Sequence, residues 1–262
     1  MLDWLAMDFR RSGWNVKSLH RLIVTSSTYR QSAQTAVNDP QNQRERDPDN
    51  RWLTRGPRFR MPSWMIRDHA LAASGLLVSE LGGPPVRPYQ PSGVWAEATF
   101  GKKRYKQHTG SKLHQRSLYT FWRRIVGPTF FFDTSKRQTC SVKIARTNTP
   151  LHALTTLNDT TYVEAARVMA EQIQTIHGQS AEAGIREAFR RVTSRRPNPE
   201  ELQRLINRWN IWVEHFTSHR EDALQFVSNG QSPLSDRFDT AEYSAHTAGW
   251  LLILNLDEGL TR

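Results

Sequence analysis

The chain has 262 residues, of which 36 are Lys or Arg and 25 are Asp or Glu, so its formal net charge is +11. Residues 101–150 contain 12 of the basic residues and a single acidic one, whereas the charges elsewhere balance. This distribution excludes a uniformly basic surface and predicts one segment that faces a polyanion. Nine Trp and eleven Phe supply large apolar side chains for a core, which argues against intrinsic disorder.

Targeting, metal and cofactor signals are sparse. No apolar run approaches the roughly 18 residues needed to span a bilayer, so we expect no transmembrane segment. Asp3 and Asp8 lie where an export signal would need a basic start and an unbroken apolar stretch. Cys140 is the single cysteine, which rules out an intrachain disulfide, a four-cysteine zinc site and a C-x-x-C-H haem attachment in this chain. We therefore expect neither a metal nor a cofactor here.

The first half of the chain predicts three helices and two irregular stretches. Two short amphipathic helices precede residue 32, and Asn15 can cap the second. Residues 32–49 are polar and rich in turn signals, which predicts an exposed excursion. Pro62-Ser63 then opens a longer helix that should end before Gly82. Residues 84–101 follow as a long Pro- and Gly-rich connector.

The second half predicts short strands and then helices. Leu118 to Trp122 and Thr139 to Ile144 have the β-branched and aromatic character of strands. From Thr149-Pro150 onward the apolar spacing is helical, and Asn198 with Glu201 fits a capping box. The expected fold is mainly α, an irregular multi-helix domain with a small β component around residues 113–145. We expect one domain over residues 1–262, with possible lobes at 1–83 and 102–262 joined by the connector 84–101.

The densest candidate binding surface runs from Gly101 to Arg124, where cations alternate with aromatic rings and no acidic residue occurs. Cations neutralise phosphate, sulfate or carboxylate groups, and exposed rings stack on bases or sugars. Alternatively, the rings belong to the core and the cations pair with the acidic residues that follow position 200. The candidate ligand-binding residues are Lys102, Lys103, Arg104, Lys106, Arg116, Tyr119, Trp122, Arg123, Arg124, Arg146, Thr147 and Asn148.

The last three of these residues precede a predicted helix, whose free N–H groups favour an anion. Simple capping is the alternative explanation. A second, enzymatic hypothesis places a pocket near Arg67, Asp68, Cys140, Arg146 and Asn148, joined by Asn158 and Asp159. A positive field around Cys140 would favour its thiolate, although a small buried strand residue is the favoured explanation for this cysteine. The sequence contains no G-x-S-x-G elbow, P-loop or dinucleotide-binding glycine motif, so no reaction is assigned.

Several long stretches carry a family resemblance. The chain resembles the planctomycete C-terminal domain of unknown function, family 1553, over almost its whole length. The stretches that carry it are LDWLAMDFRRSGWNVKSLHRLIVTSSTYRQS, DPDNRWLTRGPRFRMPSWMIRDHALAASGLL, GGPPVRPYQPSGVW, RSLYTFWRR, FDTSKRQTCSVKIARTNTPLHALTTLNDTTYVEAARVMAEQI and LNLDEGLTR.

The resemblance implies a setting that composition alone does not indicate. Domains of this family usually end a long exported protein, after a cytochrome c module and a second domain of unknown function, family 1549. An extracytoplasmic location, periplasmic or at the cell surface, is therefore expected, with haem only on the separate upstream module. The start at Met1 fits an isolated C-terminal domain or a split reading frame. The family transfers no reaction and no catalytic residue.

These observations converge on one leading hypothesis and two alternatives. The chain is expected to be an accessory or ligand-binding domain whose basic face binds a polyanion, an acidic polysaccharide or surface polymer. An enzyme domain of unknown reaction and a nucleic-acid-binding module are the alternatives, and an exported setting makes nucleic acid the less favoured partner.

Overall fold

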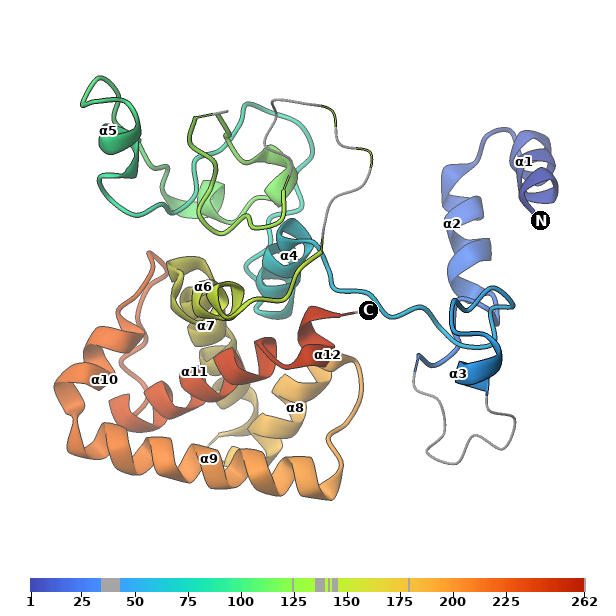
Figure 1. Cartoon of the computed structure of the whole chain (residues 1–262). Coiled ribbons are helices and arrows are strands. Elements are labelled where there is room, and N and C mark those ends of the chain that lie inside the picture. The colour runs from blue at the N-terminus through green and yellow to red at the C-terminus, as the bar shows by residue number, and fades with distance from the viewer. Residues whose placement is uncertain are drawn as a thin grey trace. The chain divides into compact units, whose positions relative to one another are not determined.

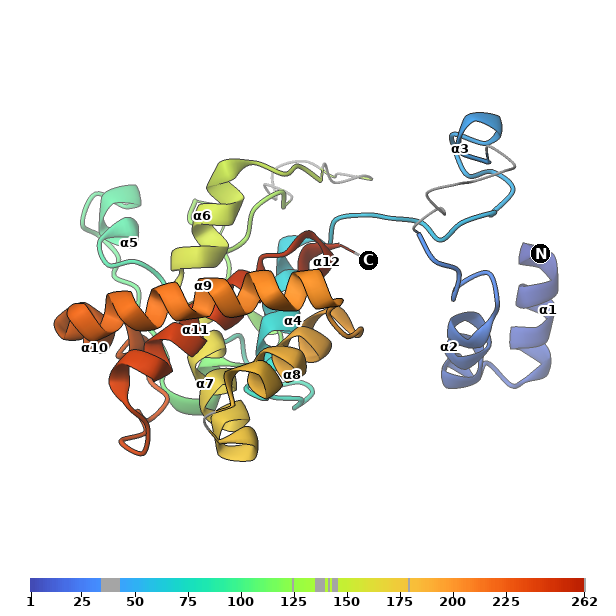
Figure 2. The same cartoon turned by 90° about the horizontal axis from the view of Figure 1, so that it is seen from below.

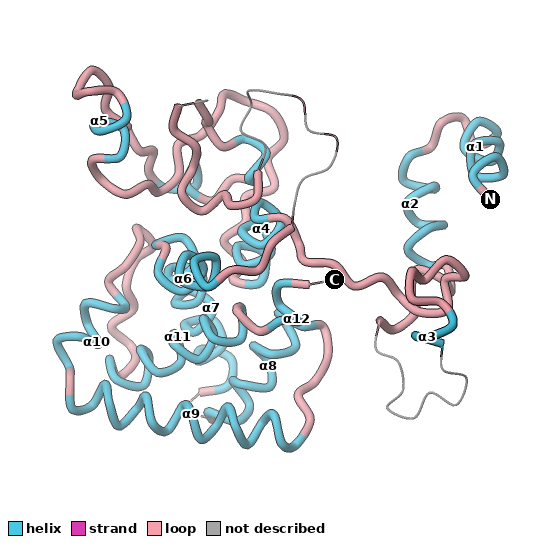
Figure 3. The backbone as a smooth tube through the Cα atoms, viewed as in Figure 1, coloured by secondary structure: helices cyan, strands magenta, loops and turns pink. Residues whose placement is uncertain are grey.

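The computed structural model describes residues 1–33, 43–123, 125–134, 140, 142, 146–178 and 180–261. The chain divides into two compact units, Met1–Phe59 and Arg60–Thr261. The boundary lies at a different place from the Pro- and Gly-rich connector 84–101, which belongs to the second unit. Helices dominate the described residues, which confirms the mainly α fold class (Figure 3).

The first unit contains three helices, α1 (Leu2–Arg11), α2 (Val16–Thr25) and α3 (Gln43–Arg46). Asn15 caps α2 as predicted, because its Oδ1 accepts the backbone N–H of Ser18 at 3.0 Å. The part of the expected polar excursion that follows α3 is ordered around a buried carboxylate. Asp47 accepts the backbone N–H groups of Arg51 at 2.7 Å and Trp52 at 2.8 Å, which fixes the turn after α3.

Helices of the second unit gather around α11, which packs against α7, α8, α9 and α10 (Figures 1 and 2). Pro150 opens α6 and Asn198 caps α9, both as the sequence predicts. The helices of this body are α4 (Ser63–Ala73), α6 (Pro150–Asn158), α7 (Thr160–His177), α8 (Ala181–Thr193), α9 (Pro199–Ser218), α10 (Arg220–Val227), α11 (Thr240–Leu254) and α12 (Asp257–Leu260).

Helix α11 forms the centre of this body. Of its 15 residues 11 are buried, and they lie on all sides of the helix. A helix that is apolar all round requires neighbours on every side. Its Trp250 is fully buried and packs beside Gly184 of α8, where an added Cβ would lie 3.3 Å from Ile173. This close approach of α8 to α7 and α11 explains the glycine within that helix.

Residues 84–123, called the basic segment below, lie between α4 and α6 and consist mostly of loops (Figure 3). They contain α5 (Val94–Ala98) and two 3-10 turns, Gly110–Leu113 and Ser117–Tyr119. The expected β component is limited in the described residues to isolated bridges, such as Val86 with Thr120. The predicted strand at Leu118 to Trp122 is wrong because its first half is a 3-10 turn, and most of the strand predicted at Thr139 to Ile144 lies outside the described residues.

A buried hydrogen bond between His114 and Glu164 ties the basic segment to the helices. His114 Nε2 donates to Glu164 Oε2 of α7 at 2.9 Å, and Glu164 Oε1 accepts the backbone N–H groups of Gln231 at 2.8 Å and Ser232 at 2.7 Å. Burial opposes the charged form of Glu164, but the hydrogen bonds from His114 and Ser232 outweigh it and lower its pKa to about 2. Gly230 has φ +95°, and a Cβ there would lie 2.5 Å from Glu164 Cδ, so the site requires glycine.

Candidate anion-binding site

The basic segment is closed at its base by backbone hydrogen bonds. Val86 N donates to Tyr119 O at 2.8 Å, and Phe121 N donates to Val86 O at 2.7 Å. Further along, His108 N donates to Arg87 O at 2.9 Å. Residues 87 and 121, which are 34 positions apart, are thereby held side by side, and the loop between them folds back on itself.

Three aromatic rings stack inside this closed loop. Trp95 stacks with Tyr105, at 5.6 Å between ring centres and 28° between ring planes, and with Phe121, at 5.8 Å and 25°. Trp95 is 5% exposed, and its Nε1 donates to Gln90 Oε1 at 2.5 Å. Tyr105 donates its hydroxyl to Pro88 O at 2.7 Å. The rings therefore form a small core that positions the charged residues around it.

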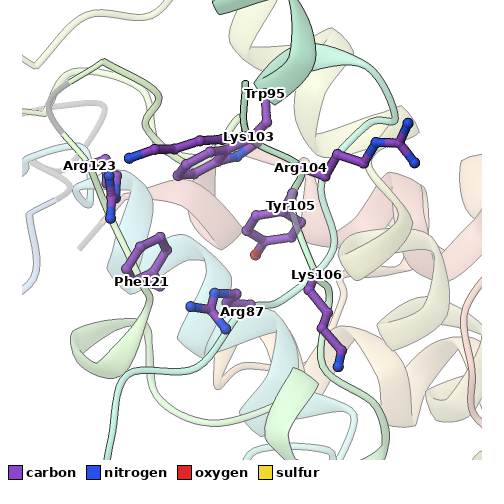
Figure 4. Close-up of a pocket in the computed structure, with 8 residues that line it drawn as sticks. All are labelled: Arg87, Trp95, Lys103, Arg104, Tyr105, Lys106, Phe121 and Arg123. Atoms are coloured by element: carbon purple, nitrogen blue, oxygen red, sulfur yellow. The ribbon is translucent and has the colours of Figure 1, made fainter. Parts of the chain in front are cut away.

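A cavity of about 250 Å³ opens beside this stack and is lined by five cations. The guanidinium carbon of Arg87 lies 4.7 Å from the centre of the Phe121 ring, and that of Arg123 lies 5.8 Å from it. In Figure 4, Lys103 extends across Trp95 toward Arg123, whereas Arg104 and Lys106 point outward. The five cations of the lining are Arg87, Lys103, Arg104, Lys106 and Arg123.

Within the described residues, none of these five cations has an acidic partner. The ion pairs found there involve other side chains. Acidic side chains of the C-terminal helices are instead paired locally. Arg204 binds Glu200 at 2.5 Å one turn away, and Arg195 contacts both Glu201 and Glu258. The alternative in which acidic C-terminal residues mask the basic face therefore does not describe this structure.

The electrostatic field of the cavity acts on neighbouring groups. Burial lowers the pKa of His108, and the positive charges of Arg87, Lys112 and Lys106 lower it further. His108 Nδ1 accepts the backbone N–H of Arg87 at 3.2 Å, which is consistent with a neutral ring. Burial likewise raises the pKa of Tyr105, against the opposing effect of Arg87. Lysines and arginines therefore carry the charge of this site at neutral pH.

The remaining residues of the expected surface have mixed positions. Lys102 and Arg116 are exposed, but neither lines the cavity. Tyr119 accepts the N–H of Gly82 with its hydroxyl at 2.9 Å, and Trp122 packs on Phe131 at 5.6 Å, so both rings serve packing. Arg124 lies outside the described residues.

The turn before α6 is occupied by a carboxylate of the protein itself. Asp133 accepts the backbone N–H of Thr147 at 2.6 Å and its hydroxyl at 2.9 Å. Arg146 and Asn148 are exposed on either side of Thr147. The anion that the sequence predicts at this turn is thus supplied from within the chain at Thr147.

Arg67 and Asp68 form a clamp rather than a reactive pair. Fully buried Arg67 donates to the carbonyl oxygens of Leu113 at 2.7 Å and Gln115 at 3.0 Å. Asp68 Oδ1 accepts the N–H of Ser117 at 2.9 Å and its hydroxyl at 2.7 Å. Burial lowers the pKa of Arg67, against the opposing charge of Asp68. The pair ties the basic segment to α4.

The other residues of the expected pocket have separate roles in the structure. Asn158 donates to Leu154 O within α6, and Asp159 caps α7 by accepting Thr161 N at 2.9 Å. Burial raises the pKa of Asp159, partly offset by the Thr161 hydrogen bond and by the charge of Arg67. Cys140 is exposed, and within the described residues no hydrogen bond or ion pair joins it to the others. The geometry gives no support to a shared catalytic pocket.

Two residues of the cavity were missed by sequence reasoning. Arg87 and Trp95 lie in the Pro- and Gly-rich stretch that was interpreted only as a connector. An isolated Arg and an isolated Trp in an irregular stretch form no pattern that predicts a site. They line the cavity only because the loop closes. The buried pair of His114 and Glu164 was missed because its members are 50 positions apart.

The described residues contain neither a metal-binding cluster nor a membrane-spanning helix. Among them, no group of three or more His, Cys, Asp or Glu side chains is arranged to hold a metal ion. None of the helices in the described ranges combines the length and apolar character needed to cross a membrane.

Comparisons with known proteins give one match. A family model, PSD1, described as "Protein of unknown function (DUF1553)", matches residues 1–209. This range contains the whole basic segment and the helices through the first half of α9. No curated protein and no solved structure matches the chain.

Proposed function

Because the chain belongs to the PSD1 family of proteins of unknown function (DUF1553), which supplies no reaction, we propose a function from the site itself: the basic segment binds an acidic polysaccharide. The single observation that carries this proposal is the cavity lined by five cations without acidic partners in the described structure. Unpaired cations around a hollow attract an anionic group, and the surrounding charge steers a polyanion toward it.

The size of the cavity favours a unit of a polymer. Its volume of about 250 Å³ is below the range of roughly 300–1,000 Å³ that is typical of pockets for complete small ligands. A single acidic sugar, with its carboxylate or sulfate directed at Arg87, Lys103 and Arg123, suits this space. The rest of the polymer would follow the exposed cations Arg104 and Lys106, whose side chains point outward (Figure 4).

Nucleic acid is the less favoured polyanion because the rings at the cavity are already in contact with protein. Trp95 is 5% exposed and stacks with Tyr105 and Phe121, and Phe121 also carries two guanidinium groups. Single-stranded nucleic acids depend on free aromatic faces for base stacking. Within the basic segment, Phe100, which is 93% exposed, is a ring on which such stacking would occur if nucleic acid were the partner.

The test measures binding to heparin, polygalacturonate and single-stranded DNA at two salt concentrations. The triple variant K103Q/R104Q/K106Q should weaken glycan binding at least about tenfold and reduce its salt dependence, because three ionic contacts are lost. The matched control, R186Q/R190Q/R204Q, removes the same charge from helices α8 and α9, where each arginine pairs with a glutamate. It should bind nearly as the wild type does.

Three outcomes would contradict the proposal. Equal weakening by the two triple variants would mean that net charge alone drives association. Tighter binding of DNA than of both glycans, lost in Phe100→Ser, would instead identify a nucleic-acid-binding module. Wild-type protein that binds none of the three polymers would remove the function altogether.

The modular setting is a further part of the proposal and rests on the motif resemblance alone. We infer an accessory role in an exported protein of planctomycete type, with cytochrome c and family-1549 modules upstream and haem confined to the former. The coding sequence upstream of this chain provides the test. An export signal followed by a C-x-x-C-H motif is expected, and an unrelated upstream region would refute this context.

A further inference from the structure

A second cavity adjoins the cationic one and shares three residues with it. It measures about 380 Å³ and is formed by residues 90–93, by Ala96 and Gln107, and by the shared residues Trp95, Arg104 and Tyr105. Tyr105 and Trp95 therefore form a wall between the two hollows. Arg104 points away from the cations around Phe121 in Figure 4, and it is the single charged residue in the lining of the second cavity.

The two hollows differ sharply in chemistry. Five cations line the first cavity, whereas the second combines one cation with amides, a hydroxyl group, proline and glycine. The Gln107 amide and the Ser92 hydroxyl have no hydrogen-bond partner in the described part of the protein, although Gln90 is engaged by Trp95 Nε1 and by Gly127 O. Ser92 is exposed and Gln107 is half-buried, so their amide and hydroxyl groups can exchange water for the hydroxyl and acetamido groups of an uncharged sugar.

We propose that the two cavities are adjacent subsites for a polysaccharide in which acidic and uncharged sugars alternate. The acidic sugar occupies the cationic cavity, the neighbouring uncharged sugar occupies the second, and Arg104 bridges the two units. This inference rests on the proposed function and narrows it from acidic polysaccharides in general to those with alternating charge. A polymer that is charged at every unit would place a second anion in a cavity whose lining has a single guanidinium group to neutralise it.

The geometry also accounts for the fixed order of the subsites. Tyr105 is held by its hydrogen bond to Pro88 O, and Trp95 is held by stacking with two rings and by its hydrogen bond to Gln90. The shared wall is thus rigid, so that the spacing of the two hollows is set before a ligand arrives. A preformed pair of subsites discriminates by the spacing of charge along the polymer as well as by its total charge.

Hyaluronan fragments provide the probe, because glucuronate alternates with uncharged N-acetylglucosamine along this polymer. Isothermal titration of the full chain would compare a tetrasaccharide with free glucuronate, and also with a polygalacturonate tetramer, which is charged at every unit. The hyaluronan tetrasaccharide should bind about tenfold more tightly than glucuronate and more tightly than the galacturonate tetramer, although the latter carries twice its charge.

Variants separate the two subsites. Ser92→Phe fills the second cavity and should reduce tetrasaccharide affinity to that of glucuronate, and Gln107→Ala should weaken the tetrasaccharide about three- to tenfold. Neither change should alter glucuronate binding. Gln225→Ala, on the exposed surface of α10, is the matched control and should leave both affinities unchanged.

The failures of the two proposals are distinguishable. If acidic ligands bind and K103Q/R104Q/K106Q weakens them, but Ser92→Phe leaves the tetrasaccharide unaffected, the second subsite is refuted while the polyanion function stands. Stronger binding of the galacturonate tetramer would also overturn the alternating pattern. Absence of binding by glucuronate and both oligosaccharides would refute the proposed function and this inference with it.

Discussion

Helices α8 and α9 and the basic segment differ in how they use positive charge. In the helices, Arg186 and Arg204 lie one turn from a glutamate and contact it at 2.7 and 2.5 Å. In the basic segment, Lys103 and Lys106 are exposed around a cavity without any acidic partner in the described residues. Charge is neutralised where it decorates a helix, and it stays available where the chain forms a hollow.

A third arrangement lies between these two regions. Arg67 is fully buried, and its guanidinium group donates hydrogen bonds to carbonyl oxygens of the basic segment. The 36 basic residues therefore include three kinds of positive charge. Some charges are buried and structural, some are neutralised by a glutamate, and some are free. Only the third offers a binding surface, and each use predicts a different response to substitution.

The largest effect is expected for the buried use. Arg67→Met should lower the free energy of unfolding by about 3–5 kcal/mol, because it leaves two carbonyl oxygens without their donor and removes the positive charge beside Asp68. Urea denaturation measures the change. Arg116→Met, an exposed cation in the same segment, is the control and should change stability by less than about 0.5 kcal/mol. A similar small change for Arg67→Met would show that its buried contacts contribute little.

A second large effect is the pH dependence of the free energy of unfolding, which arises within the helical region. His246 of α11 is buried between Trp209 and Trp250, and burial lowers its pKa from 6.5 to about 4. The unfolded chain then binds a proton that the folded chain excludes, so stability is fully present above pH 6.5 and falls as the pH drops toward 4. The loss should reach about 3 kcal/mol at pH 4.

His246→Phe preserves an aromatic ring and should remove this part of the acid sensitivity. Unfolding curves between pH 7 and 4 measure it, with exposed His215→Phe as the control. Parallel pH profiles for the wild type and His246→Phe would show that the buried ring does not resist protonation. Glu164 adds a further loss as the pH falls from 4.5, the ordinary pKa of the group, toward its folded pKa of about 2.

The smallest effects separate neutralised from free charge. The variant R186Q/R190Q/R204Q should lose about 1 kcal/mol of stability in total, because each exposed helical pair contributes roughly 0.3–0.5 kcal/mol. K103Q/R104Q/K106Q should stay within about 0.5 kcal/mol of the wild type, although it is the variant expected to lose ligand binding. Thermal unfolding of both measures the contrast. Marked destabilisation of the second variant would reveal structural contacts for these cations.

Local sequence patterns predicted most of the helical body. The capping box of Asn198 and Glu201 is present, with both hydrogen bonds at 2.8 Å, and Pro150 begins α6. The helical apolar spacing predicted from Thr149-Pro150 onward corresponds in α7 and α8 to residues that are buried in the structure, including Met169 and Phe189. These signals are local, since they depend on neighbours within one or two helical turns.

The site was predictable only in part because it depends on distant contacts. Composition pointed to Lys103, Arg104, Lys106 and Arg123, but Arg87 joins them only through loop closure at Val86 and Phe121. The structural role of Arg67 was likewise invisible, because its carbonyl partners lie 46 and 48 residues away. Periodicity carries no information about such pairs, and loops without periodicity conceal them most.

The loop closure has an energetic consequence for the cations it brings together. Like charges around one cavity repel one another, and the bonds of Val86 with Tyr119 and Phe121 hold them close against that repulsion. The free protein thus retains an unfavourable electrostatic energy that an anion or added salt relieves. Ligand binding and folding are coupled in this way, so that any anion that enters the cavity also stabilises the fold around it.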